Sequence, residues 1–457
     1  MEGRCLRMGN KLKCDLLPGA ISFATVFVFA LSLQAEGTES GVDISRPAQP
    51  RTLTLAEVKQ TALERNWDLL AAKSGIDAAT AQLIVTKEYP NPIVSLTTMK
   101  IDAHGQGNGT TLGNSFWNRS YDTIAAVSQL VEIGGKRGQR QASARSGIVG
   151  ARARFYDARR LLDQGVTKAY VAALLAQENM RTLRESAQLL QREAGIAEIR
   201  FKAGDISDSD RKQIEINAGR FELDARTAEV TAASARITVE VLMGIEHPRG
   251  DWAPGNSLDE LAVSSARAST SKPGAFRPDL LAAEADLRKS QFDLKLQKAL
   301  RIPDPTFLVQ YERNPPGPPG PDTVGLGVSF PLPLWNRNGG AIRAAQTAQA
   351  QAALQVGKVQ AQVVSEITTA ELAYNDALER RQRYLTQIRP KSEQVRKTLA
   401  FAYEKGGASL VDLLTAERDD NEVRLATAQA MSDSAMAAAD LAAARTVFTE
   451  AELTPPK

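Results

Sequence analysis

Long stretches of the chain place apolar or small residues three and four positions apart, the pattern of helices that pack side by side. One such seam runs through Ala173, Ala176, Met180, Leu183, Ala187, Leu190, Ala194, Ala197 and Phe201. A second has the same spacing at Leu385, Ile388, Ser392, Val395, Leu399 and Ala402. The spacing is typical of a coiled coil, and its small residues let neighbouring helices approach closely. It predicts two long helical hairpins, at about 138–244 and 341–450.

Shorter regions alternate apolar with polar or small residues, which is the pattern of a β-strand with one apolar face. One face of the segment 323–330 carries Val324, Leu326, Val328 and Phe330, and the other carries Gly325, Gly327 and Ser329. Residues 307–312 alternate in the same way, and residues 121–133 do so less strictly. We expect one β-hairpin at about 92–133 and a second at about 305–333.

The two halves of the chain follow the same plan. The motif Asp68–Ala72 (DLLAA) returns at Asp279–Ala283, and each copy begins a helical stretch that ends at a Pro-x-Pro pair. Proline ends a helix and favours extended structure before it. A repeat of this length is too long for a solenoid unit and indicates a duplicated half-protein. The expected parts are a signal peptide at 1–35, a first repeat at 36–247, a linker at 248–278, a second repeat at 279–450 and a tail at 451–457.

Residues 1–35 have the layout of a secretory signal peptide. Basic residues precede an apolar run, Ile21–Leu33, and small residues follow it. The run is too short to span a membrane as a helix, which needs about 20 apolar residues. We expect cleavage near Ala35, with an uncleaved N-terminal anchor as the alternative. The exported chain would contain no cysteine, because Cys5 and Cys14 lie in the removed segment.

Charge and composition exclude several classes of function. The chain has 56 Lys and Arg against 53 Asp and Glu, mixed along its length, so it has no basic stripe for nucleic acid. Its only histidines are His104 and His247. These residues cannot supply a Cys/His zinc site or a nucleophile–base–acid set. We therefore expect no enzyme activity, no cofactor and no resident metal site. A basic cluster at Lys136, Arg137, Arg140 and Arg145 is expected to lie on a solvated surface.

Four strands with an apolar face cannot close a membrane barrel alone, since the smallest have about eight. Open sheet edges are not tolerated in lipid. The stretch from Gly138 to Phe201 would be about 95 Å long as one helix, at 1.5 Å per residue. Helices of that length cannot cover a four-stranded soluble sheet. An exported chain of this kind is therefore expected to close a barrel with other copies of itself.

At this point the chain resembles the TolC-type outer-membrane efflux family over essentially its whole mature length. The resemblance rests on the duplicated plan, the Pro-x-Pro strand starts and the aromatic-x-x-Gly turns at Phe201–Gly204 and Tyr403–Gly406. The segments Ser128–Arg137 (SQLVEIGGKR) and Phe330–Asn338 (FPLPLWNRN) are most similar to the branch that serves cobalt–zinc–cadmium resistance pumps. The resemblance implies a mainly α fold with a small β part. A long antiparallel coiled-coil tunnel in the periplasm would join a transmembrane β-barrel closed by trimerisation in the outer membrane.

The resemblance also implies partners and a gate. Such a homotrimer sits in outer-membrane lipid and docks on a periplasmic adaptor (membrane fusion) protein and an inner-membrane resistance–nodulation–division pump. The family pattern implies a channel gate at Asp210, Tyr403 and Asp412. The adaptor-docking tips would be Gly204, Asp205, Ile206, Ser207, Gly406, Gly407, Ala408 and Ser409. This chain departs from better-known members at Ala408, where they carry an arginine, and at Thr415, where they carry an aspartate.

The expected function is that of a passive conduit for heavy-metal cations in a tripartite efflux system. Organic drugs or secreted polypeptides are alternative cargoes for the same architecture. A non-pore periplasmic coiled-coil protein is an alternative of another class, although a rod has no need of apolar-faced hairpins. For Asp210 and Asp412 the alternative to a gate is ordinary capping of a helix start.

Overall fold

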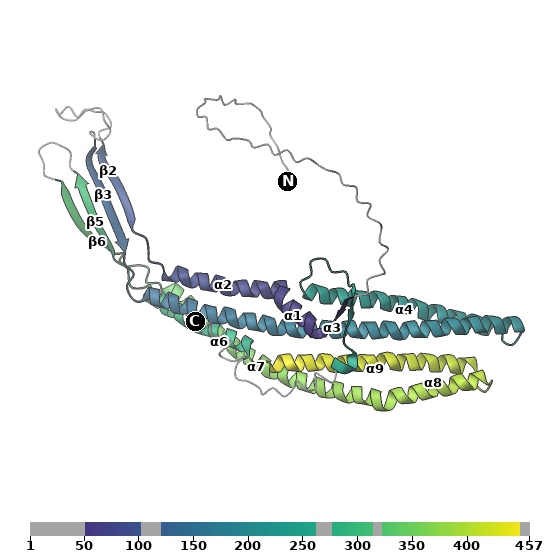
Figure 1. Cartoon of the computed structure of the whole chain (residues 1–457). Helices are drawn as coiled ribbons and strands as arrows, with labels where there is room; N and C mark the ends of the chain where they lie inside the picture. The colour runs from purple at the N-terminus through teal and green to yellow at the C-terminus, as the bar shows by residue number, and fades with distance from the viewer. Residues whose placement is uncertain (1–50, 102–119, 262–276, 314–321, 448–457) are drawn as a thin grey trace, which may run out of the picture. The chain divides into compact units, whose positions relative to one another are not determined.

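The computed structural model describes residues 51–101, 120–261, 277–313 and 322–447 of the 457-residue chain (Figure 1). These residues belong to one compact unit, Pro50–Lys457. The expected signal peptide, the tail and His104 lie outside the described residues. Within the described ranges, no helix combines the length and the apolar character needed to cross a membrane.

Each half of the chain has short helices before its strands and a long helical hairpin after them (Figure 1). The first half contains α1 (Leu55–Arg65), α2 (Trp67–Lys87), α3 (Lys136–Ala203) and α4 (Asp208–Leu242). The second half contains α6 (Pro278–Ala299), α7 (Gly339–Arg383), a π-helical turn η2 (Tyr384–Ile388), α8 (Arg389–Glu404) and α9 (Leu410–Arg445). Pro278 begins α6 at a position where a missing N–H costs nothing.

Four strands form one antiparallel sheet in the order β2-β3-β5-β6. They are β2 (Ile93–Ile101), β3 (Ser120–Leu130), β5 (Thr306–Arg313) and β6 (Thr323–Ser329). The pairing of β3 with β5 joins the hairpin of the first half to that of the second. Directly opposed residues share a face, and one row across the sheet is Val94, Val127, Val309 and Leu326.

The two predicted helical seams differ in burial. Ala173, Ala176, Ala187, Leu190 and Ala197 of the first seam are buried, because α3 packs against α4 and α9. In the second seam, no residue of α8 is buried by the described part of the chain. Its neighbours here are α9 and the adjoining η2, so its outward side has no helix to cover it within the described residues.

The expected linker is partly structured. Within it, β4 (Trp252–Pro254) pairs in parallel with β1 (Arg51–Leu53). Trp252 is 4% exposed and stacks on the ring of Tyr170 in α3, with 5.9 Å between centroids. The Tyr170 hydroxyl donates a hydrogen bond to the carbonyl of Leu53 at 2.8 Å. A core of apolar side chains from both halves surrounds this pair, so the segment is a packed part of the fold.

Candidate channel tip, sheet face and inter-repeat contacts

The turns at the ends of the two helical hairpins are built in the same way. Gly204 and Gly406 have φ values of 82° and 78°, in the left-handed region that glycine adopts without strain. Ser207 then caps α4 and Ser409 caps α9, each accepting a hydrogen bond from the backbone N–H three residues on. All eight residues expected at the docking tips lie in these two turns.

Asp210 and Asp412 lie in the first turns of α4 and α9, where each accepts a hydrogen bond from the N-cap serine of its helix. Asp412 accepts hydrogen bonds from the hydroxyl of Ser409 at 2.7 Å and from its backbone N–H at 3.2 Å. Asp210 accepts one from the hydroxyl of Ser207 at 2.9 Å. Both bonds from Ser409 lower the pKa of Asp412, and the bond from the hydroxyl has the larger effect. The charged cap is therefore present at neutral pH and is lost only as the pH falls through that lowered pKa.

Tyr403 links the two helical hairpins near their ends. Its hydroxyl accepts a hydrogen bond from Nη1 of Arg200 at 3.3 Å, and the guanidinium lies 5.7 Å from the centre of its ring. Arg200 is in the last turn of α3, whereas Tyr403 is in the last turn of α8. Sequence reasoning missed Arg200, whose only signal is its place directly before the aromatic turn.

Charged and polar groups contribute to the contact between α8 and α9. The guanidinium of Arg396 lies 3.2 Å from a carboxylate oxygen of Glu417 and 3.2 Å from one of Asp420. Ser392 donates a hydrogen bond to Asp420 at 3.0 Å. Burial is the largest effect on Glu417 and raises the pKa of its carboxyl, although Arg396 acts to lower it. A charged layer of this kind fixes the register of α8 on α9.

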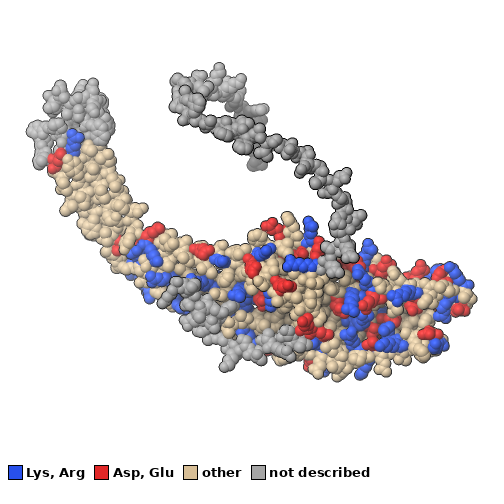
Figure 2. All heavy atoms as spheres, viewed as in Figure 1, with Lys and Arg blue, Asp and Glu red and all other residues tan. Residues whose placement is uncertain are grey.

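The sheet has one apolar and one polar face. The row of Val94, Val127, Val309 and Leu326 is exposed, as is most of the next row, which contains Leu96, Tyr311 and Val324. The other face carries Ser95, Thr97, Gln310, Glu312 and Thr323. In Figure 2 charged side chains cover the helices, but the visible face of the sheet has almost none until its far end. An exposed apolar patch this large marks an interaction surface.

The basic cluster at the start of α3 is only partly the solvated surface that was expected: Arg145 is exposed, whereas Lys136 is buried. Lys136 is 3% exposed; its ammonium lies 2.7 Å from Asp304 and donates to the carbonyl of Ile302 at 2.5 Å. Arg140 binds both carboxylate oxygens of Glu132 at 2.6 Å. Lys136 thus joins the first repeat to the loop before β5, where the duplicated halves meet, whereas Arg140 binds within its own repeat.

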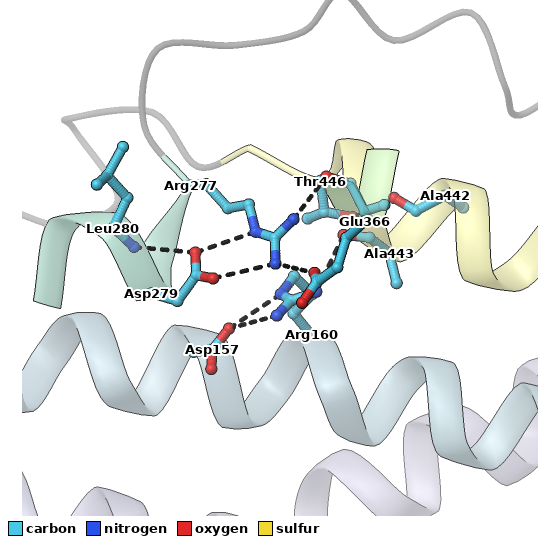
Figure 3. Close-up of polar contacts among 10 residues, drawn as sticks. Asp157, Arg160, Arg277, Asp279, Leu280, Glu366, Ala442, Ala443 and Thr446 are labelled. Atoms are coloured by element: carbon cyan, nitrogen blue, oxygen red, sulfur yellow. Dashed lines mark hydrogen bonds and ion pairs between the residues drawn. The ribbon is translucent and has the colours of Figure 1, made fainter. Parts of the chain in front are cut away.

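Two buried arginines bind the end of α9 (Figure 3). Arg277, 4% exposed, donates to the carbonyl of Ala444 at 3.4 Å and pairs with Asp279 at 3.0 Å and with Glu366. Arg160 of α3 donates to the carbonyl of Ala443 at 3.3 Å. The carbonyls at a helix C-terminus have no partners within the helix, and cations there also favour its dipole.

The first repeat contains the counterpart of the Arg277 contact. Asn66 and Arg277 each stand two residues before the repeated DLLAA motif, and both are buried N-cap residues. Asn66 donates through its side chain to the carbonyl of Leu242, the last residue of α4, at 3.0 Å. In both repeats, therefore, the start of a short helix binds the end of the returning long helix.

The sequence model of the outer membrane efflux protein family matches residues 58–244 and 275–445 of this chain. The chain belongs to this family. Among similar proteins, the cobalt-zinc-cadmium resistance protein CzcC of Cupriavidus metallidurans is 26% identical over 404 residues, 87% of this chain and 90% of that protein. The family expected from the motifs is confirmed.

Solved channel structures have the same fold. The outer membrane protein VceC of Vibrio cholerae superposes with a TM-score of 0.68 at 17% identity, covering 85% of this chain and 95% of that one. The open state of the MtrE channel of Neisseria gonorrhoeae gives 0.67 at 20% identity, covering 86% and 88%. The predicted fold class, mainly helical with four antiparallel strands per chain, is confirmed. As an outer membrane efflux protein, the chain is an outer-membrane channel with a periplasmic helical domain, and it is not an enzyme.

Ala408 and Thr415 are the two positions at which this chain was expected to differ from better-known efflux proteins. Ala408 lies in the α8–α9 turn, and Thr415 turns its hydroxyl back to the carbonyl of Val411 at 2.7 Å. Neither can form an ion pair. The cationic contact near Tyr403 comes instead from Arg200 on the other hairpin.

Proposed function

We propose that this efflux channel is a passive conduit for heavy-metal cations, working with a periplasmic adaptor and an inner-membrane resistance–nodulation–division pump. The likeness to CzcC, a protein named for cobalt, zinc and cadmium resistance, is the observation that carries the proposal. A conduit requires no resident metal site. Among the described residues, no group of three His, Cys, Asp or Glu side chains is placed to hold a metal ion, and His247 is exposed in the turn after α4.

Assembly into a homotrimer is the second part of the proposal. TolC-family channels are trimers, and the sheet of one chain ends in two edge strands, β2 and β6. Pairing β6 of each copy with β2 of the next closes a twelve-stranded barrel with the apolar rows facing lipid. The helices support the same arrangement. Exposed residues of α4 follow a heptad, Ile216, Leu223, Val230 and Ile237, and Ile388 and Val395 of the second half are exposed as well. Both helices therefore have apolar sides that helices of a neighbouring copy can cover.

We place the gate at the periplasmic tip, where Asp210, Tyr403 and Asp412 line the constriction and the eight turn residues dock the adaptor. The duplicated turns support this assignment, because they bring both aspartates to the same end of the helical hairpins. A ring of three Asp412 carboxylates attracts cations and opposes anions. The Arg200–Tyr403 contact holds the two hairpins of each protomer together in the closed state.

Replacing Asp412 is expected to change ion selectivity. Asp412→Ala leaves conductance equal or raised and reduces cation preference, because the ring loses its charge. Asp412→Arg impairs conduction of divalent cations by repulsion. Planar-bilayer recordings on the purified trimer measure both.

Asp412→Asn separates the charge from the cap, since an amide oxygen can still accept from Ser409. Asp376→Ala, an exposed change in α7 away from the tip, serves as a control. Unchanged selectivity in both the Ala and the Arg variants, with trimers intact, places Asp412 outside the pore.

Deleting the gene is expected to lower tolerance of cobalt, zinc or cadmium, and expression of the wild-type chain restores it. The double variant His104→Ala/His247→Ala restores tolerance nearly as well, because passage requires no tight site in this chain. Growth against metal concentration is the measurement, with a panel of organic drugs as the comparison. If the deletion sensitises cells to drugs and leaves metal tolerance unchanged, the cargo is organic and the metal proposal is wrong.

A further inference from the structure

We propose that the segment between β6 and α7, Phe330–Trp335, is a lipid anchor that completes the membrane crossing of the second hairpin. Trp335 lies at the headgroup level on the periplasmic side. The partner of this surface is phospholipid, not another copy of the chain. The inference rests on the proposed orientation of the apolar sheet face toward lipid.

The length of β6 is the first reason. Its ladder covers seven residues, Thr323–Ser329, whereas a transmembrane strand needs about 9–11. Beyond the ladder, Phe330, Leu332 and Leu334 continue the alternation of apolar positions seen in β6. All three are more than half exposed. The apolar run from Val324 to Leu334 is eleven residues long, which is the length of a full crossing.

The backbone of the segment suits the edge of a bilayer. An irregular backbone in lipid is costly because unpaired N–H and C=O groups find no water. Pro331 and Pro333 have no N–H, so two of the donors that would be left unpaired beyond the last ladder pair are absent. The N–H of Leu334 donates to the carbonyl of Leu332 at 2.9 Å.

Trp335 ends the apolar run and is 94% exposed. An indole ring with one polar N–H is favoured where hydrocarbon meets headgroups. Asn336, Arg337 and Asn338 follow at once, and Asn338 fixes the turn by donating to the carbonyl of Gln297 at 2.8 Å. The change from apolar to polar residues thus occurs over a single position.

The backbone of the corresponding segment of the first repeat is hydrogen-bonded to protein, and its apolar side chains are less exposed, with Val131 and Ile133 at 40%. The N–H of Val131 donates to the carbonyl of Pro305 at 2.9 Å, and that of Ile133 donates to Asp304 at 2.9 Å. Glu132 is held by Arg140. The anchor is therefore a feature of the second repeat, so a trimer has three.

Fluorescence quenching in vesicles tests the anchor. The full chain is reconstituted in phosphatidylcholine vesicles whose acyl chains carry bromine either near the carbonyl or near the methyl end. A variant with Trp67→Phe, Trp117→Phe and Trp252→Phe retains Trp335 alone. Its emission is expected to be mostly lost with bromine near the carbonyl and little affected with bromine near the methyl end. A chain that retains only Trp67, exposed on α2, is expected to be quenched by aqueous iodide and not by either lipid.

Two further chains keep the test decisive. Because Trp252 is a core residue, Trp335→Phe in the otherwise native chain provides the complementary measurement: the fraction of emission quenched by lipid should fall. Leu326→Trp in the single-tryptophan background without Trp335 reports on the sheet face itself. Quenching at position 326 without quenching at Trp335 overturns the anchor and leaves the sheet orientation intact. Absence of quenching at both positions overturns the orientation as well. Trp335 shielded from both lipid and iodide is buried against another copy, which also overturns the anchor.

Discussion

Leu326→Arg is expected to prevent stable assembly of the channel in the outer membrane. Leu326 is 83% exposed in the single chain and lies at the end of the apolar row that starts at Val94. An arginine on the lipid face costs about 2–4 kcal/mol near the bilayer midplane. Each copy in a trimer carries the same cost, so the effect on assembly multiplies. Outer-membrane fractionation and the yield of detergent-resistant trimer measure it.

Ser95→Arg is the matched control, since it introduces the same side chain on the polar face of the same sheet. In the proposed barrel this face lines water, and the variant should assemble nearly as well as wild type. Equal assembly of both arginine variants would mean that the apolar face does not meet lipid. Failure of both would point to the strands being intolerant of arginine in general, and would remove the support for a two-faced barrel.

Arg277→Ala is expected to lower the free energy of unfolding by about 1.5–3 kcal/mol, the contribution of hydrogen bonds to a charged group; the value is below that of a fully buried ion pair because Glu366 is 54% exposed. The substitution leaves the end of α9 without its bond at Ala444 and leaves Asp279 without its ion-pair partner (Figure 3). Burial lowers the pKa of Arg277, but its bonds to Glu366 and Asp279 raise that pKa by more, so the net shift is upward. The guanidinium is therefore charged throughout the neutral range. Thermal unfolding of the detergent-solubilised protein, followed by circular dichroism, checks the loss.

Arg288→Ala serves as the control for charge removal. Arg288 lies on the same helix, is mostly exposed and pairs with Glu284 at 3.7 Å. Exposed pairs of this spacing contribute about 0.3–0.5 kcal/mol. If Arg277→Ala unfolds at the same temperature as Arg288→Ala, the contact at the end of α9 contributes nothing measurable.

The elements and the family could be predicted from the sequence because they depend on local rules. A 3-4 seam makes a helix, alternation makes a strand, and a Pro-x-Pro pair separates them, whatever the rest of the chain does. The tip turns are equally local: glycine permits the left-handed conformation, and the serine three residues on caps the next helix. The duplicated DLLAA motif already indicated that the same elements occur in both halves of the chain. Position relative to the turns also placed Asp210 and Asp412 correctly at the helix starts, while their role in a gate stays a prediction.

Contacts between distant segments were decided only by the tertiary structure. Nothing near Arg200 in the sequence indicates Tyr403, and nothing near Trp252 indicates that a glycine- and proline-rich stretch pairs with β1. Lys136 was expected in solvent, yet the meeting of the two repeats buries it against Asp304. The uncovered seam of α8 likewise depends on contacts between distant segments. A heptad pattern indicates that a helix packs against another helix. Which helix is its partner depends on how the repeats and the copies of the chain come together in space.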